Sequence, residues 1–230
     1  MISKILVWDL PVRIIHWSVA FCFLGLMLTG ETERLRDIHI FLGYTLAALM
    51  LMRLIWGFTG SKYARFSEFV RPLSTVLVYL KSLFSLRPAH YVGHNPAGAL
   101  VILGLLALGL AASASGVLLQ YEVIDIDSIE ELHEILSYIM LSLVFVHIFG
   151  VFVSSFIHKE KLILAMITGR KNGADQSLAI KSANPLFALF IVVVIFGFAF
   201  FYFGYASVTN VADKLLTPSA EQRESARDED

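Results

Sequence analysis

Five long apolar stretches constrain this sequence more than any other feature, because each is close to the length needed to cross a lipid bilayer. They cover residues 14–30, 38–58, 96–119, 132–157 and 185–205. A helix needs about 20 apolar residues to span a hydrocarbon core about 30 Å thick. Hydrophobic residues make up 57% of the 230 and charged residues only 16%, which excludes an ordinary soluble domain. The sequence therefore predicts an all-α integral membrane bundle of five transmembrane helices, surrounded by membrane lipids.

The segments between these stretches complete the predicted organisation. Residues 61–94 form the longest connection, and apolar residues recur in it at three- and four-residue steps from Phe66 to Phe84. That period is typical of an amphipathic helix lying in the membrane interface between the second and third spans, although a short buried helix has the same pattern. We expect residues 1–205 to form one transmembrane domain and residues 206–230 to be a polar, disordered tail.

The basic residues are distributed unevenly over the predicted loops. With the N-terminus in the cytoplasm, thirteen of the 18 lysines and arginines lie on the cytoplasmic side and five on the other side. The positive-inside rule then places the C-terminus in the periplasm of a bacterial inner membrane. Trp8, Trp17 and Trp56 would lie in the cytoplasmic interface belt. The basic residues form no continuous stripe, so nucleic acid is not an expected partner.

Four histidines within the spans define two depths in the membrane. His133 and His147 are fourteen residues apart. On a helix this spacing gives a rotation roughly 40° short of four full turns and a rise of about 21 Å. Both rings therefore leave one helix face near opposite sides of the bilayer. His16 is level with His147, and His39 is level with His133. Because an imidazole in hydrocarbon is costly, we interpret the two level pairs, His16/His147 and His39/His133, as the axial ligands of two haem irons.

Further residues fit this interpretation. Arg53 lies fourteen residues after His39, and Arg13 lies three residues before His16, so both arginines are candidates to pair with haem propionates. Gly43 lies one turn after His39 and removes a side chain where a porphyrin edge would lie. Cys22 is the only cysteine in the sequence, whereas a C-x-x-C-H attachment site for haem needs two. The haem would therefore be non-covalent haem b.

Simpler interpretations exist for each of these residues. A single intramembrane histidine is more often a hydrogen-bonding contact between helices, and Arg53 also fits an arginine that extends from a helix end to the interface. His90, His94 and His158 lie in loops or at helix ends, where solvated histidines are common. His94 is the one among them that we would test for contact with a quinone or a propionate.

The sequence also resembles a known family. The motifs are Arg13-Ile-Ile-His16-Trp17, the helix from His39 through Gly43 to Arg53, Gly93-His94-Asn95-Pro96-x-Gly98, and His133-x13-His147. Together, over about residues 5–170, they look like the bacterial cytochrome b561 and hydrogenase-type cytochrome b superfamily. The resemblance implies a helical bundle with two b haems, the same four histidine ligands, and electron transfer between a partner on the outer face and the quinone pool.

The expected function is therefore that of a di-haem electron carrier. The acidic segment 121–131 and the C-terminal tail would suit docking of a periplasmic partner such as a c-type cytochrome or a dehydrogenase subunit. Three alternatives remain at this point: a superoxide:quinone oxidoreductase, the membrane anchor of a hydrogenase or similar dehydrogenase, and a haem-free transporter whose histidines line a polar pathway.

Overall fold

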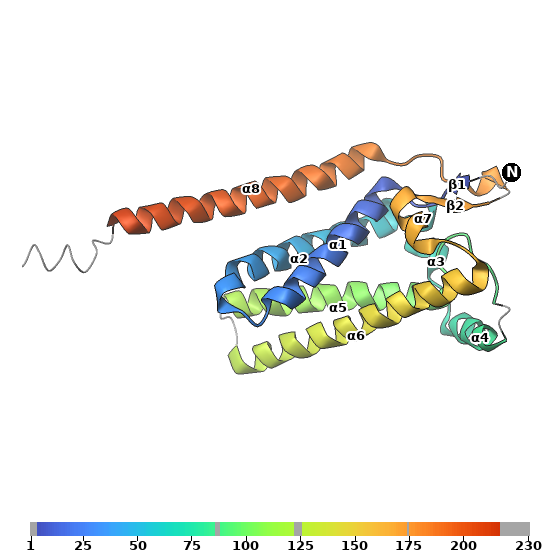
Figure 1. Cartoon of the computed structure of the whole chain (residues 1–230), viewed down its shortest axis with the longest axis horizontal. Helices are drawn as coiled ribbons and strands as arrows, with labels where there is room; N and C mark the ends of the chain where they lie inside the picture. Colours follow the sequence, from blue (N-terminus) through green and yellow to red (C-terminus); the bar gives the residue numbers. More distant parts are fainter. Residues whose placement is uncertain (1–3, 86–87, 122–125, 174, 217–230) are drawn as a thin grey trace, which may run out of the picture. The chain divides into compact units, whose positions relative to one another are not determined.

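A computed structural model describes residues 4–85, 88–121, 126–173 and 175–216 (Figure 1). The helices are α1 Leu10–Thr29, α2 Arg36–Thr59, α3 Phe66–Phe69, α4 Leu73–Phe84, α5 Pro96–Gln120, α6 Ile126–His158, α7 Leu162–Thr168 and α8 Pro185–Leu216. Short 3₁₀ helices cover Glu33–Leu35, Lys62–Ala64 and Gln176–Leu178, and the strands are β1 Lys4–Leu6 and β2 Arg170–Asn172. The chain divides into two compact units, residues 1–191 and residues 192–230, and each is described by itself.

Helices α1, α2, α5 and α6 form a bundle in the first unit (Figure 1). Helix α1 packs against α2, α2 against α5, and α5 against α6. Among the described residues, five helices are long and apolar enough to cross a membrane: these four and residues 185–205 of α8. Large apolar side chains such as Phe21, Phe58 and Phe156 are exposed on the helices, as a lipid-facing surface requires. The predicted all-α, multi-pass membrane bundle is confirmed.

Side-chain caps fix where α1 and α5 begin. The Asp9 carboxylate accepts a hydrogen bond from Val12 N at 2.9 Å, and Pro11 occupies the first turn of α1. The Asn95 amide oxygen accepts one from Gly98 N at 2.7 Å, and Pro96 begins α5. Such caps satisfy backbone N–H groups that have no partner within the helix. The loop residues just before α1 and α5 are therefore held in place.

The structure differs from the prediction in the connection between α2 and α5. Instead of one helix over residues 66–84 there are two, α3 and α4, separated by residues 70–72. Pro72 explains the break, because proline lacks the N–H that a continuing helix needs. Figure 1 shows α4 nearly end-on while α5 and α6 run across the view, so α4 crosses the end of the bundle.

The structure differs from the prediction at two other places. Strand β1 pairs antiparallel with β2, with Ile5 opposite Lys171, and local sequence patterns did not predict this pair. Helix α8 continues past Tyr205 to Leu216, so the first part of the predicted disordered tail is helical, and residues 217–230 lie outside the described residues.

A compact core closes the end of the bundle that carries the β1–β2 pair, which we call the sheet end. Its buried members come from the start of the chain, from the end of α2 and the residues after it, and from the segment after α6: Ile5, Val7, Trp8, Val12, Trp56, Tyr63, Ala64, Ala165 and Ile180. Trp8 and Trp56 are 6% and 9% exposed, so their rings pack into this core and do not face lipid; their level at the cytoplasmic interface stays a prediction. Gly169, with φ of 78°, turns the chain from α7 into β2, and a Cβ there would lie 2.5 Å from Trp8 O.

The carboxylate of Asp9 is fully buried beside this core. Besides capping α1, it accepts hydrogen bonds from Trp56 Nε1 at 3.0 Å and from Asn184 Nδ2 at 3.3 Å. The Trp56 ring in turn stacks on Phe187, with centroids 4.3 Å apart and planes 8° apart. One side chain thus joins the start of α1, the end of α2 and the segment before α8.

Candidate functional site

The bundle brings the four predicted histidines together as two facing pairs. His16 on α1 faces His147 on α6 with ring centroids 6.3 Å apart and an angle of 52° between the planes. His39 on α2 faces His133 on α6 with the same centroid separation, 6.3 Å, and an interplanar angle of 71°. Helix α6 therefore contributes one ring to each pair, as the fourteen-residue spacing predicts.

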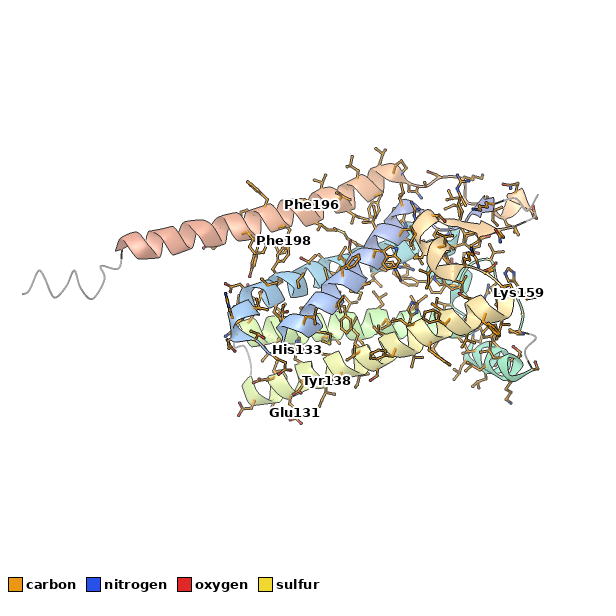
Figure 2. All side chains as sticks on the ribbon, viewed as in Figure 1. Glu131, His133, Tyr138, Lys159, Phe196 and Phe198 are labelled. Atoms are coloured by element: carbon orange, nitrogen blue, oxygen red, sulfur yellow. The ribbon has the colours of Figure 1, made fainter. Side chains whose placement is uncertain are left out.

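The two pairs lie toward opposite ends of the bundle. Figure 2 shows His133 near Glu131 at one end of α6, with Lys159 following the other end. His147 lies nearly four turns closer to the sheet end. The pair His16/His147 is therefore called the sheet-end pair, and His39/His133 the far pair.

The separation within each pair fits a metal ion held between two imidazoles. A metal–imidazole bond is about 2 Å long, and a ring centre lies about 1 Å from its nitrogen, so rings on opposite sides of one ion have centres roughly 6 Å apart. Both observed separations match this value.

Hydroxyl groups orient both rings of the far pair. His133 Nδ1 lies 3.0 Å from both Ser115 Oγ and Ala112 O, and Ser115 Oγ donates its proton to Ala112 O at 2.9 Å. A carbonyl only accepts, so Nδ1 of His133 carries the proton. The Nε2 lone pair of His133 is then available to a metal.

His39 has an equivalent arrangement. Its Nδ1 lies 3.2 Å from Thr29 Oγ1, which donates its own proton to Gly25 O at 2.8 Å. The hydroxyl therefore accepts from Nδ1–H of His39, and Nε2 again remains free. Sequence reasoning missed Thr29 and Ser115, because a hydroxyl residue in an apolar helix has many other uses.

The sheet-end pair lacks such an oriented hydroxyl on His16. His16 Nδ1 is buried and has no hydrogen-bond partner among the described residues. Buried polar atoms are normally paired, so this nitrogen is one that a bound group or a water molecule would satisfy.

The two candidate arginines lie at the sheet end with donors to spare. Arg13 Nη1 donates to Ile167 O at 2.8 Å, and Arg53 Nη2 donates to Ala64 O at 3.2 Å. Within the described structure Arg13 Nε and Arg53 Nη1 are buried without partners. Buried guanidinium donors of this kind suit an anionic group such as a carboxylate.

Gly43 leaves open space on α2. A Cβ at this position would meet only Leu26 Cδ2, at 4.0 Å, a distance of ordinary contact. The neighbouring side chains therefore do not require glycine at position 43.

His94 packs between aromatic rings at the sheet end. Its ring centroid lies 4.6 Å from that of Trp8 and 4.8 Å from that of Phe69. Burial, together with the charges of Arg53, His147, Lys171 and His16, lowers the pKa of His94 to about 3. His94 is thus a neutral imidazole near the sheet-end pair, unlike the solvated loop histidine of the simpler interpretation. His90 and His158 lie together farther out, with ring centroids 5.3 Å apart.

Fold and site together define a class of protein: a membrane-spanning helical bundle that holds imidazole pairs one above the other inside the membrane. Comparison with known families makes this more specific. The family model of prokaryotic cytochrome b561 matches residues 7–169, more than half of the chain. The chain therefore belongs to the prokaryotic cytochrome b561 family.

Several curated proteins are similar to the chain. A probable Ni/Fe-hydrogenase B-type cytochrome subunit of Rhizobium leguminosarum bv. viciae is 26% identical over 219 residues, which cover 76% of this chain and 91% of that protein. A probable Ni/Fe-hydrogenase 1 B-type cytochrome subunit of Escherichia coli K12 is 28% identical over 147 residues, 50% of this chain and 60% of that protein. No solved structure matches the chain significantly.

Family membership and the five apolar helices define the general function. The protein is a multi-pass membrane cytochrome b that binds haem and takes part in electron transport.

Proposed function

We propose that the protein holds two b haems, one between His16 and His147 and one between His39 and His133, and carries electrons between them. The observation that supports this proposal is the equal centroid separation, 6.3 Å, of two histidine pairs that share α6. Each haem, when bound, supplies a site that accepts and releases one electron.

The residues of the chain have distinct roles in this proposal. Ser115 and Thr29 fix the rings of the far pair so that Nε2 faces the centre of the pair, which a metal ligand needs. Arg13 and Arg53 offset the negative charge of propionates at the sheet end through their unpaired N–H groups. Gly43 leaves space for the edge of a flat group, and the surrounding apolar helices exclude water.

We further propose that electrons pass between a redox partner on the periplasmic face and a quinone at the cytoplasmic face. The excess of basic residues beside the sheet end supports a cytoplasmic N-terminus. The partly buried, neutral His94 beside the sheet-end pair supports a quinone there, because its ring offers a hydrogen bond to a carbonyl oxygen.

The similar proteins favour one kind of partner. Those from Rhizobium leguminosarum and Escherichia coli K12 are named as hydrogenase B-type cytochrome subunits. We therefore propose that the partner is the catalytic part of a hydrogenase or similar dehydrogenase, with this chain as its membrane anchor. A c-type cytochrome at the same face is the second candidate. Co-purification from native membranes distinguishes them, since an anchor remains bound to a catalytic subunit and a carrier does not.

Haem content tests the proposed ligands. Pyridine haemochrome measurement on the purified protein should give two b haems per chain. His133→Ala and His147→Ala should each lose one, and His158→Ala, on the same helix but outside both pairs, should keep two. One haem in the parent, or a loss in the His158 control equal to that in the other variants, contradicts the assignment.

A further inference from the structure

A group of charged and polar side chains lies at the sheet end, apart from both histidine pairs. Glu160, in the turn after α6, is at its centre. Glu160 Oε2 lies 2.7 Å from Lys171 Nζ, and Glu160 Oε1 lies 2.9 Å from His90 Nε2. These three residues are neither proposed haem ligands nor proposed partners of the propionates.

The three side chains lie at graded depths. His90 is half exposed, with 50% of its side chain accessible, whereas Glu160 is 12% and Lys171 only 5% exposed. Lys171 also donates to Val92 O at 3.1 Å, so its ammonium group is fixed by the loop before α5. Lys171 therefore anchors one oxygen of Glu160, and the other oxygen is left to the histidine that reaches water.

A small cavity borders this group. It has a volume of about 30 Å³ and is lined by His90, Glu160, Lys171, His158, Asn95 and Ser154, among others. A polar cavity holds a water molecule when it offers more than about 10–15 Å³ and two to four polar partners. Here Asn95 Nδ2 donates to Ser154 Oγ at 3.3 Å, so polar atoms continue to its inner side.

Part of the cavity wall belongs to the loop that carries His94. Gly93 and Asn95, the neighbours of His94 on either side, both line the cavity. The ring of His94 packs against Trp8 and Phe69, near the sheet-end pair. The cavity therefore runs from a water-exposed imidazole to the backbone on either side of His94, the residue beside which the proposed function puts the quinone.

We propose that His90, Glu160 and the cavity they border form the path by which protons move between cytoplasmic water and the quinone. This inference rests on the proposed function. Reducing a quinone to a quinol adds two electrons from the redox partner and two protons, which form two O–H bonds, and the reverse oxidation releases both protons. Glu160 is the anion that draws a proton onto His90, and Lys171 is the positioning residue that holds Glu160.

The charge balance of the group agrees with this role. Burial alone would raise the pKa of Glu160, but the hydrogen bonds and charges of Lys171 and His90 lower it below its ordinary value. Glu160 is thus anionic near neutral pH. The titratable groups that face it are Lys171 from β2, His90 from the loop before α5 and His158 from the end of α6.

The test compares quinone reactions of the full-length, haem-loaded protein. The pre-reduced protein is mixed with decylubiquinone, and haem oxidation is followed by stopped-flow absorbance from pH 6 to pH 9. For the proton-releasing direction, the oxidised protein is mixed with decylubiquinol. His90→Ala and Glu160→Gln should slow the proton-coupled reaction roughly tenfold at high pH and less at low pH. The effect depends on pH because a proton relay speeds a reaction according to how much of it is in the protonation state that the transfer needs. Added imidazole should restore the His90→Ala rate, and Glu160→Asp should retain part of the parent rate.

The matched control is Lys161→Ala, an exposed cation next to Glu160 that does not line the cavity; it should react like the parent. A second readout needs no quinone. In an infrared pH titration the carboxyl band of Glu160, identified by its loss in Glu160→Gln, should titrate at higher pH in His90→Ala, because the neighbouring cation is gone.

The possible failures are distinguishable. Parent-like rates at every pH in both variants overturn the proton path. The proton path is also overturned if the rate falls equally at all pH values, is not restored by imidazole, and the unfolding temperature falls as well. The group would then only stabilise the structure. A parent protein that exchanges no electrons with quinone or quinol overturns the proposed function itself.

Discussion

Replacing Asp9 by alanine should destabilise the protein strongly, although Asp9 touches neither histidine pair. The carboxylate is fully buried and accepts hydrogen bonds from Val12 N, Trp56 Nε1 and Asn184 Nδ2 at 2.9, 3.0 and 3.3 Å. Alanine offers no acceptor. The substitution therefore leaves three donors without a partner at the junction of three segments.

The expected loss follows from these contacts one by one. Removing an N-cap costs about 1 kcal/mol. The bond from the Trp56 indole to a charged oxygen is worth about 1.5–3 kcal/mol. The longer contact from Asn184 adds roughly 0.5 kcal/mol. Together these losses lower the free energy of unfolding by about 3–4.5 kcal/mol, and removing a buried charge reduces this loss.

The assay is unfolding in mixed micelles with increasing dodecyl sulfate, followed by far-ultraviolet circular dichroism. A double-mutant cycle with Trp56→Phe isolates the indole contact, because phenylalanine keeps an aromatic ring to stack on Phe187 but has no N–H. We expect a coupling energy of about 1.5–3 kcal/mol between Asp9 and Trp56. A coupling below about 0.5 kcal/mol would show that the buried carboxylate does not stabilise this junction as reasoned.

Three further predictions concern the candidate site and its surroundings. Ser115→Ala should weaken haem retention in the far pair about tenfold, and not more, because Ala112 O still orients His133. Retention is measured as the haem lost on dilution, and unchanged retention would contradict the role of the hydroxyl. Gly43→Ala should leave the unfolding temperature of haem-free protein unchanged, since only Leu26 Cδ2 lies within 4 Å, yet lower haem content; full haem content would remove Gly43 from the cofactor site. Because the pKa of His94 is lowered to about 3, the unfolded chain binds a proton that the folded chain does not as pH falls below about 6.5, so stability should decrease by up to about 1.4 kcal/mol per pH unit. His94→Gln should flatten that dependence between pH 6 and pH 4 in unfolding titrations, and an equal slope in both proteins would refute it.

The sequence predicted the parts of the structure that depend on local periodicity. Apolar length alone predicted five membrane-spanning helices, and helical spacing predicted that α6 presents His133 and His147 to two partners. These features need no knowledge of distant contacts, because the rise and rotation of a helix are nearly constant. The break at Pro72 is also marked in the sequence, but the prediction rested on the regular apolar pattern from Phe66 to Phe84.

Other features depend on contacts between distant segments and could not be predicted in this way. The tryptophans Trp8 and Trp56 sit near helix ends, where an interfacial belt is the usual expectation. They are buried because the segment after α6 returns to cover them. The pairing of β1 with β2 and the hydroxyl partners of His39 and His133 likewise depend on tertiary arrangement, which three-residue strands and single hydroxyl side chains do not reveal.

The hydrogen bond between Asp9 and Asn184 has a consequence for biosynthesis. The ribosome makes Asp9 at the beginning of the chain, and its partner Asn184 appears only after α1, α2, α5 and α6 have been synthesised. The β1–β2 pair closes only slightly earlier, when residues 170–172 emerge. The sheet end therefore stays open during translation while all three helices that carry the paired histidines are already available, which gives a period in which a large planar molecule can enter between them before the last contacts form.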